Sequence, residues 1–302
     1  MEKVKIFVSY KDNHRLLKNE IITPIQTGRT LSNEKFEGML GDDTGDNISK
    51  DNERYNELSA QYWVWKHYEE IGAPEYVGFM HYRRHFIFDK NFDTSELDRW
   101  HNKMDIYTVD SFDAECLENI SCQNINKILS SESDCYAIKP YDIRFFKDND
   151  LYMKEHYINT IPGAKRIVWD AFYSAVKKMY PDYSNLLDEF TYGHHINCCN
   201  MFIMKKELFF EYSKFCFDIL NEIDKNVDST NFDKNEIRFL GYFGEYLLTI
   251  FIMKLKRENK KIEFLDAIYI KNIDQKTINK KPNKFFSYTK NDVHSVLYIL
   301  GI

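Results

Sequence analysis

Short apolar runs alternate with longer segments of helical periodicity along the chain. Residues 5–9, 76–80 and 201–204 are compact apolar runs, too short for helices, and they predict buried strands. Further strands are predicted at residues 105–109, 135–138 and 262–265. Because strands and helices follow one another in this way, the pattern predicts an α/β fold whose mainly parallel central sheet is flanked by helices.

Four segments have the apolar spacing of amphipathic helices. One helix is predicted to start at the N-cap residue Asp51 and to end at Gly72, and a second covers residues 164–180 before Pro181. The third helix follows the apolar run 201–204 and has a strong apolar stripe, and the fourth helix opens at Gly241-Tyr-Phe-Gly-Glu. The predicted inward-facing positions are Tyr55, Leu58, Tyr62 and Trp65 in the first helix, Leu208, Tyr212, Phe215, Ile219 and Ile223 in the third, and Phe243, Leu247, Ile250 and Phe251 in the fourth.

The chain is expected to form a single domain over residues 1–302, with a less regular C-terminal extension from about residue 267. Residues 41–47 form its most turn-like stretch, and residues 141–163 lack clean periodicity. The N-terminus lacks the apolar core of a signal peptide, and no stretch approaches the ~20 apolar residues of a membrane span. We expect a cytoplasmic location with at most peripheral contact at the inner face of the cell membrane. The basic residues that either meet anionic lipid there or form a solvated surface are Lys271, Lys276, Lys280, Lys281 and Lys284.

The composition excludes some partners. A net charge of −6 argues against a nucleic-acid partner, which usually requires a basic surplus. Aromatic residues make up 16% of the chain and serve either as core or as platforms for sugars and bases. The six cysteines form no Cys-x-x-Cys pair, and the adjacent Cys198 and Cys199 are poorly placed to chelate one ion or to pair with each other. They are expected to be reduced thiols in a cytoplasmic protein.

The first candidate site is the segment His-Tyr-Arg-Arg-His at 81–85, which directly follows the apolar run 76–80. In an extended strand its first, third and fifth residues face one way. Ligands of α/β sheets bind beyond the carboxyl ends of strands, and a guanidinium fork suits phosphate. We predict that His81, Arg83 and Arg84 bind a nucleotide diphosphate, with Ser9 at the end of the first strand beside the nucleotide. The alternative is that the arginines cap helix ends or pair with surface carboxylates.

Two carboxylates in the glycine-bounded loop 41–47, Asp42 and Asp43, form the second candidate site. Neighbouring carboxylates hold Mg²⁺ or Mn²⁺, or accept hydrogen bonds from ribose or uracil. The same sequence also suits an ordinary turn. No essential cofactor is predicted, although a divalent metal, Mn²⁺ or Mg²⁺, is compatible with this loop.

Glu245 is the candidate catalytic residue. Group transfer to a hydroxyl needs a general base that deprotonates it, and a Glu near a helix start is well placed for this role. The alternative is that Glu245 only complements the helix dipole.

Further polar residues next to predicted strands are expected either to contact the donor sugar or acceptor or to make structural hydrogen bonds. The adjacent His194 and His195 have no acidic neighbour and so do not form a zinc site, and no metal ligands are assigned. The chain also lacks the dinucleotide-binding, P-loop, serine-hydrolase and zinc-protease motifs. The residues expected at the donor sugar or acceptor are His85, His194, His195 and Asn200.

At this point the sequence resembles a bacterial family of capsular and exopolysaccharide biosynthesis glycosyltransferases that was first grouped as a domain of unknown function. The matching pieces lie in the family's order across most of residues 1–260. The most specific piece is Tyr-Val-Gly-Phe-Met-His-Tyr-Arg-Arg at 76–84. The others lie at residues 5–9, 41–48, 55–66, 200–205 and 241–248.

The resemblance implies a GT-A-like nucleotide-binding fold and a nucleotide-sugar donor, with UDP favoured and galactofuranose or galactose as the leading sugars. It implies a surface-polysaccharide or lipid-linked glycan acceptor. It also places Glu245 where inverting enzymes of this fold carry their base. One departure is that most GT-A enzymes have an Asp-x-Asp metal motif where this chain has His81-Tyr-Arg. Either His and Arg meet the diphosphate without a metal, or Asp42 and Asp43 supply a metal site from another loop.

The sequence therefore predicts a glycosyltransferase. Because a fold does not dictate function, two alternatives remain. One is a non-catalytic carbohydrate-binding or assembly protein on the same fold. The other is a phosphosugar or other group transferase that uses the same cationic segment.

Overall fold

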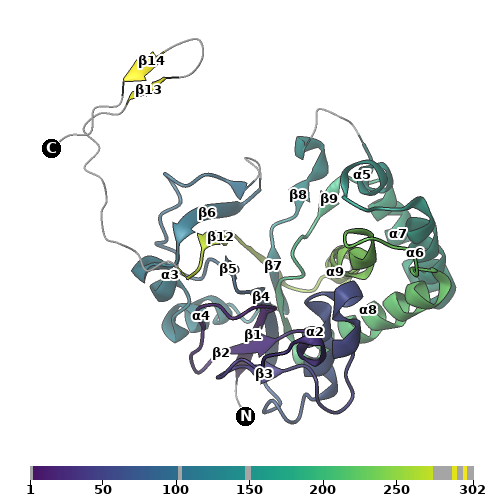
Figure 1. Ribbon diagram of the computed structural model, residues 1–302, viewed down its shortest axis with the longest axis horizontal. Helices are drawn as coiled ribbons and strands as arrows, with labels where there is room; N and C mark the ends of the chain where they lie inside the picture. The colour runs from purple at the N-terminus through teal and green to yellow at the C-terminus, as the bar shows by residue number, and fades with distance from the viewer. Residues whose placement is uncertain (1–2, 101–103, 147–150, 275–287, 291–294, 298–302) are drawn as a thin grey trace.

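The computed structural model describes residues 3–100, 104–146, 151–274, 288–290 and 295–297. Within them, ten strands form one sheet in which β11, β7, β10, β4, β1, β2 and β3 lie in this order, and β5, β6 and β12 extend it (Figure 1). The strands of this sheet are β1 (Val4–Tyr10), β2 (Ile22–Gln26), β3 (Leu40–Gly41), β4 (Tyr76–His81), β5 (Arg84–Phe86), β6 (Ile106–Ser111), β7 (Cys135–Ile138), β10 (Phe202–Lys205), β11 (Ile262–Leu265) and β12 (Ala267–Asn272). Two small pairs join β8 (Tyr141–Asp142) to β9 (His195–Ile196) and β13 (Tyr288–Lys290) to β14 (Ser295–Leu297).

Most strand pairs of the main sheet are parallel, which confirms the predicted α/β class. β1 pairs in parallel with β2 and with β4, and β7 with β11. β10 runs antiparallel to both β4 and β7 in the middle of the sheet, and β5 runs antiparallel to β4 and β12. As a result, the residues that precede β10 lie beside the carboxyl end of β4.

Side chains of the central strands alternate between two cores, one on each face of the sheet. In β1, Phe7 packs with the first core, whereas Ile6 and Val8 pack with the second. The first core is covered by α2 and α5–α9, and the second by α3, α4 and the strands β5, β6 and β12. The helices are α1 (Asn52–Tyr55), α2 (Leu58–Lys66), α3 (Ala114–Asn119), α4 (Cys122–Leu129), α5 (Met153–Thr160), α6 (Arg166–Met179), α7 (Ser184–Thr191), α8 (Lys206–Asn226) and α9 (Phe239–Arg257).

The predicted stripes of α8 and α9 are confirmed, since every inward-facing position assigned to them is buried. The helix predicted from Asp51 is wrong in its extent. It is divided into α1 and α2 at Asn56, whose φ of 51° interrupts the helix, and α2 ends at Lys66 rather than at Gly72. α9 begins at Phe239, so Glu245 lies in its second turn and not at its start.

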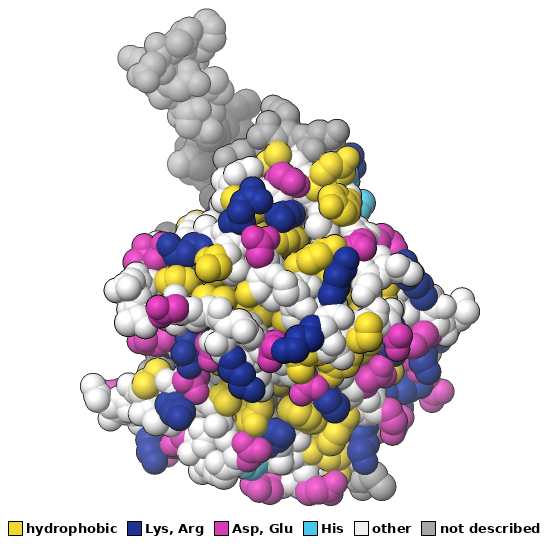
Figure 2. Space-filling view, turned by 90° about the vertical axis from the view of Figure 1, so that its right-hand side faces the viewer, with side chains coloured by type: hydrophobic (Ala, Val, Ile, Leu, Met, Phe, Trp, Pro, Cys, Tyr) yellow, Lys and Arg dark blue, Asp and Glu magenta, His cyan; other side chains and the backbone are white. Residues whose placement is uncertain are grey.

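The sheet continues past residue 267, where a less regular extension was expected, because β12 pairs with β5 and β6. Of the basic residues considered for lipid contact, Lys271 ends this strand and bonds Asp110, and Lys276, Lys280, Lys281 and Lys284 lie outside the described residues. None of the helices in the described ranges has the length and apolar character that a bilayer crossing requires. On the face that carries α5–α8, basic, acidic and apolar side chains are interspersed (Figure 2).

Candidate active site

The hairpin between β4 and β5 decides which way the cationic segment 81–85 faces. β4 and β5 are antiparallel, with His81 opposite Arg84, so the chain reverses over Tyr82 and Arg83. His81 and Arg84 therefore lie together, whereas Arg83 lines a separate pocket with Tyr82. The prediction that alternate residues of this segment share one face was wrong, because it assumed an extended strand.

His81 holds the backbone that precedes β10. Its Nε2 lies 2.6 Å from the carbonyl oxygen of Cys199. Since a carbonyl can only accept, Nε2 carries the proton of this hydrogen bond. Burial lowers the pKa of His81, with Glu57 acting in the opposite direction, which disfavours the cationic form of the ring. In this structure His81 is therefore placed to position Cys199 rather than to meet a diphosphate as a cation.

Two carboxylates, Glu57 and Glu245, lie together beside Arg84. Glu57 is in the turn between α1 and α2, and Glu245 is in α9. Burial and then the charge of Glu57 raise the pKa of Glu245 to about 8, although a hydrogen bond from the Cys199 N–H and the guanidinium groups of Arg84 and Arg238 act to lower it. Like charges held close together in this way are a common arrangement for a general base.

Asn200 joins the two carboxylate-bearing elements. Its Nδ2 donates to Glu57 Oε1 at 2.7 Å and to the carbonyl oxygen of Gly241 at 3.3 Å. Cys199 and Asn200 have φ angles of 69° and 48°, so two consecutive non-glycine residues adopt the left-handed conformation. Such backbone strain persists only where surrounding contacts impose it, and it concentrates at functional sites. The predicted site residue Asn200 thus lies at the carboxylate pair.

Two glycines of α9 permit this close packing. A Cβ at Gly241 would lie 2.3 Å from Asn56 Nδ2, and a Cβ at Gly244 would lie 2.6 Å from Leu58 Cδ1 and 3.0 Å from Asn200 Oδ1. The Gly-x-x-Gly-Glu pattern therefore brings the α1–α2 turn against α9, with Glu245 directly after the second glycine.

Asp42 has a role inside the fold. Its carboxylate is fully buried and accepts hydrogen bonds from the backbone N–H groups of Gly28 and Arg29 and from the hydroxyls of Ser49 and Ser59, at 2.6–3.0 Å. A carboxylate offers about four acceptor positions, and these four donors occupy them. The expectation that Asp42 contacts a nucleotide or metal is therefore not supported by its geometry.

The other two candidates of this region differ in position: Asp43 is partly exposed, and Ser9 is buried next to the site. Asp43 is 3.8 Å from Arg29 Nη1 and 3.8 Å from Lys35 Nζ, in long ion pairs that leave it partly exposed. Ser9 is buried at the end of β1, in register with His81 of β4. Ser9 is thus next to the site, and Asp43 lies on a separate loop.

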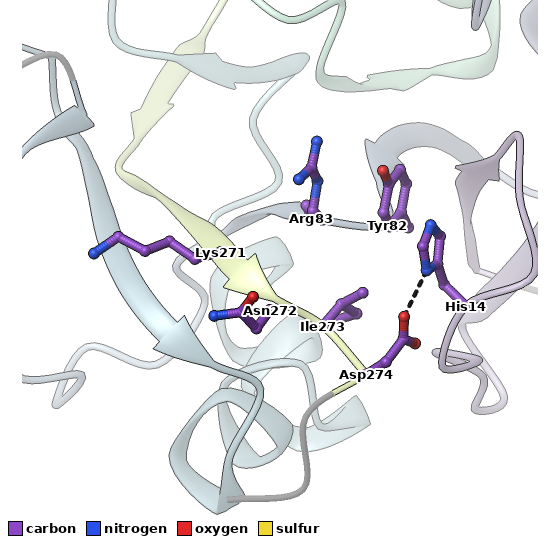
Figure 3. Close-up of a pocket in the computed structure, with 7 residues that line it drawn as sticks. All are labelled: His14, Tyr82, Arg83, Lys271, Asn272, Ile273 and Asp274. Carbon is purple, nitrogen blue, oxygen red and sulfur yellow. Dashed lines mark hydrogen bonds and ion pairs between the residues drawn. The ribbon is translucent and has the colours of Figure 1, made fainter.

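Two pockets are lined in part by residues of this region. One of about 420 Å³ is lined by Tyr82, Arg83, His14, Lys271 and Asp274, among others; His14 stacks on Tyr82 and bonds Asp274 (Figure 3). The other, of about 580 Å³, is lined in part by Lys11, just after β1, and by Asn56 and Arg238, which are hydrogen-bonded to each other at 3.1 Å. The carboxylate pair therefore adjoins a pocket through Asn56 and Arg238.

The remaining candidate histidines differ in their surroundings. His85 is fully buried against Phe112, and burial lowers its pKa to about 3, so it does not face a ligand as expected. His194 and His195 line a further pocket beside α9. In the described part of the chain, no group of three or more His, Cys, Asp or Glu side chains is arranged to hold a metal ion.

All six cysteines are free, and five of them are buried. The sulfur atoms of Cys198 and Cys199 lie 3.3 Å apart and form no disulfide. The left-handed conformation of Cys199 brings the two thiols together next to the site.

Sequence reasoning missed Glu57, Arg238 and the backbone of Cys199. Glu57 had one signal, namely a carboxylate placed between two positions of an apolar stripe, Tyr55 and Leu58. Arg238 had none, because only the packing of α9 on the α1–α2 turn brings it to Asn56.

Comparisons with known proteins place this geometry in context. The family model described as "Domain of unknown function (DUF4422)" matches residues 5–258. Among solved structures, the apo structure of the bifunctional glycosyltransferase WbbM is similar, with a TM-score of 0.80 and 29% sequence identity. The similarity covers 95% of this chain and 48% of that one, so the chain spans about half the length of WbbM. No curated protein sequence matches the chain.

Proposed function

The chain belongs to the family described as domain of unknown function DUF4422, and from this premise we propose that it is a glycosyltransferase that uses a nucleotide-sugar donor. The fold of a bifunctional glycosyltransferase over 95% of the chain supports sugar transfer as the reaction class. The observation that carries the proposal is the Glu57–Glu245 carboxylate pair, next to Arg84 and to the strained Cys199–Asn200 backbone.

Glu245 is the general base of this proposal. It takes the proton of an acceptor hydroxyl while the acceptor oxygen bonds the anomeric carbon of the donor sugar. The bond from that carbon to the diphosphate breaks, and the nucleoside diphosphate leaves with the electron pair. The reaction inverts the anomeric configuration. A base works best with a pKa near the working pH, and burial together with the charge of Glu57 brings the pKa of Glu245 into that range.

Cationic side chains of the pocket in Figure 3 are proposed to stabilise the leaving diphosphate. Arg83 and Lys271 line it, with the Lys271 ammonium paired to Asp110, and Tyr82 provides an aromatic wall. Guanidinium and ammonium groups stabilise charge that develops on a leaving phosphate. The end of β4 carries His81-Tyr-Arg rather than carboxylates, which supports a diphosphate site that does not depend on a metal.

The finer features of the proposal concern substrates and location. The donor is a UDP-sugar, with galactofuranose or galactose as the sugar, and the acceptor is a hydroxyl of a capsular or other surface polysaccharide under assembly. The GT-A-like class, the cytoplasmic location and peripheral contact with the inner membrane face belong to the same proposal. It is supported by the sequence motifs at residues 76–84 and 241–248, which both lie at the site.

The test begins with a thermal-shift screen of the purified protein against UDP, GDP, CDP and their common sugars, with EDTA or with Mn²⁺. A ligand that binds only the folded state raises the melting temperature. A shift with UDP that survives EDTA supports the metal-independent site, whereas a shift that requires Mn²⁺ moves the weight to Asp43. Hydrolysis of the bound donor is then compared between wild type and Glu245→Gln, with the exposed Glu70→Gln as matched control.

We expect Glu245→Gln to lower the transfer rate by roughly 10²–10⁴-fold, which is the usual contribution of a general base. A wild-type rate in Glu245→Gln would refute the role of this residue. Glycan binding without binding of any nucleotide would instead favour a non-catalytic carbohydrate-binding protein. Turnover of a phosphosugar in the absence of a nucleotide would favour a different group transferase.

A further inference from the structure

A pocket of about 450 Å³ lies between the C-terminal half of α9 and the segment that carries β9. His194 and His195 line it on one side, and Met253 and Lys256 of α9 on the other. The backbone of its β9 side is fixed, because the carbonyl oxygens of Gly193 and His194 accept hydrogen bonds from Met153 and Ile143, respectively. The pocket is thus a built feature of the fold, separate from the cationic pocket of Figure 3.

This pocket lies on the same face of α9 as Glu245. Glu245, Thr249, Met253 and Lys256 are three or four residues apart, so their side chains follow one another along one side of the helix. Thr249, at the floor of the pocket, donates to the carbonyl oxygen of Glu245 at 2.9 Å and accepts from the backbone N–H of Asn197 at 3.0 Å. With a rise of 1.5 Å per residue, the pocket runs from about 6 Å to about 16 Å beyond Glu245 along the helix.

The side chains at the pocket suit a carbohydrate. Tyr152 and Tyr192 are 46% and 63% exposed, and their rings meet edge to face. The Tyr152 ring is 5.2 Å from that of His194, so the aromatic surface continues into the wall of the pocket. Exposed aromatic rings stack on the apolar faces of sugars, while imidazole and ammonium groups bond their hydroxyls.

One of the two basic side chains that line this pocket is paired with an acidic one. Arg257, on the wall of the pocket, forms an ion pair with Glu189 across it. Lys256 is the other basic side chain of the lining. The pocket of Figure 3 is no more cationic, because its Lys271 is paired with Asp110 and Asp274 also lines it.

We propose that the pocket between α9 and β9 binds the acceptor as an oligosaccharide, with its terminal hydroxyl directed along α9 to Glu245. This assignment rests on the proposed glycosyltransferase function. The charge of Glu245 also acts on Tyr141, whose neighbour Pro140 lines the pocket, so the two sites adjoin on the β8 side as well.

The test separates acceptor binding from donor turnover. Octyl β-glycosides of galactose, glucose, mannose and N-acetylglucosamine serve as acceptor probes, and their Kd is measured by saturation-transfer NMR. The Kd of UDP and the hydrolysis of UDP-sugars without acceptor are measured in parallel. The variants are Lys256→Ala, which changes the lining of the pocket, and Tyr152→Ala, which removes the ring that packs on His194 of its wall. The control is Ile167→Ala, which removes a 62% exposed side chain of α6 outside the pocket.

We expect at least one glycoside to bind the wild-type protein and its Kd to rise threefold or more in each pocket variant relative to Ile167→Ala. That increase should exceed any change in the Kd of UDP. The assignment is overturned if no glycoside binds, or if the pocket variants bind glycosides like the control. Absence of UDP-sugar hydrolysis by the wild-type protein would instead overturn the proposed function on which the assignment rests.

Discussion

The raised pKa of Glu245 makes the stability of this protein depend on pH in a definite direction. In the unfolded chain the carboxyl has its ordinary pKa of 4.5, and in the folded protein the pKa is about 8. Between these values the folded state binds more protons than the unfolded state, so stability falls as the pH rises from 4.5 to 8. Replacing Glu245 with Gln removes this loss.

The magnitude follows from the shift. At 1.36 kcal/mol per pKa unit, the difference between about 8 and 4.5 corresponds to roughly 5 kcal/mol. Because the side chain is partly exposed to solvent, we expect a measured effect of roughly 2–4 kcal/mol. Glu245→Gln should therefore be more stable than wild type by this amount at pH 9 and by less than about 1 kcal/mol at pH 5.

The assay is urea unfolding followed by tryptophan fluorescence at pH 5, 6, 7, 8 and 9, with the slope of the transition checked for constancy. The exposed Glu70→Gln serves as control and should show no such trend. A stability gain in Glu245→Gln that is equal at pH 5 and pH 9, or a loss at pH 9, would refute the reasoning. It would mean that the carboxylate is ionised in the folded protein without penalty.

Three further predictions concern the residues that build the site. Glu57→Gln removes the neighbouring charge that raises the pKa of Glu245, so the rise of kcat/KM with pH should move to lower pH; an unchanged pH profile would argue against the pair. Gly241→Ala places a Cβ 2.3 Å from Asn56 Nδ2 and should lower the free energy of unfolding by roughly 1–3 kcal/mol in urea, against little change for an alanine substitution at an exposed position. Asp42→Asn replaces one carboxylate oxygen with an amide NH2 group that faces two of the four buried donors, and it should destabilise the fold by roughly 2–4 kcal/mol; a destabilisation below about 1 kcal/mol would contradict its structural role.

The apolar pattern by itself determined much of the fold. Runs such as residues 76–80 are too short for a helix and too apolar for a surface strand. They therefore predicted strands that are buried on both faces of a sheet. The stripe from Leu208 to Ile223 likewise predicted α8, because helix periodicity is a local property. The same local information placed His81 and Arg84 next to the end of a strand, where ligand sites form, whereas Glu245 lies in the second turn of α9.

Only the tertiary structure decided which of these residues meet. The chain reversal at Tyr82 and Arg83 separated Arg83 from His81, which an extended strand would have kept on one face. The antiparallel insertion of β10 brought Cys199 and Asn200 to the end of β4, and the glycines of α9 let the turn at Asn56 approach closely enough to bring Glu57 to Glu245. Such contacts join segments more than a hundred residues apart and depend on turn geometry and close packing. A sequence pattern encodes the periodicity of one element at a time, so the carboxylate pair emerged only once the elements were packed.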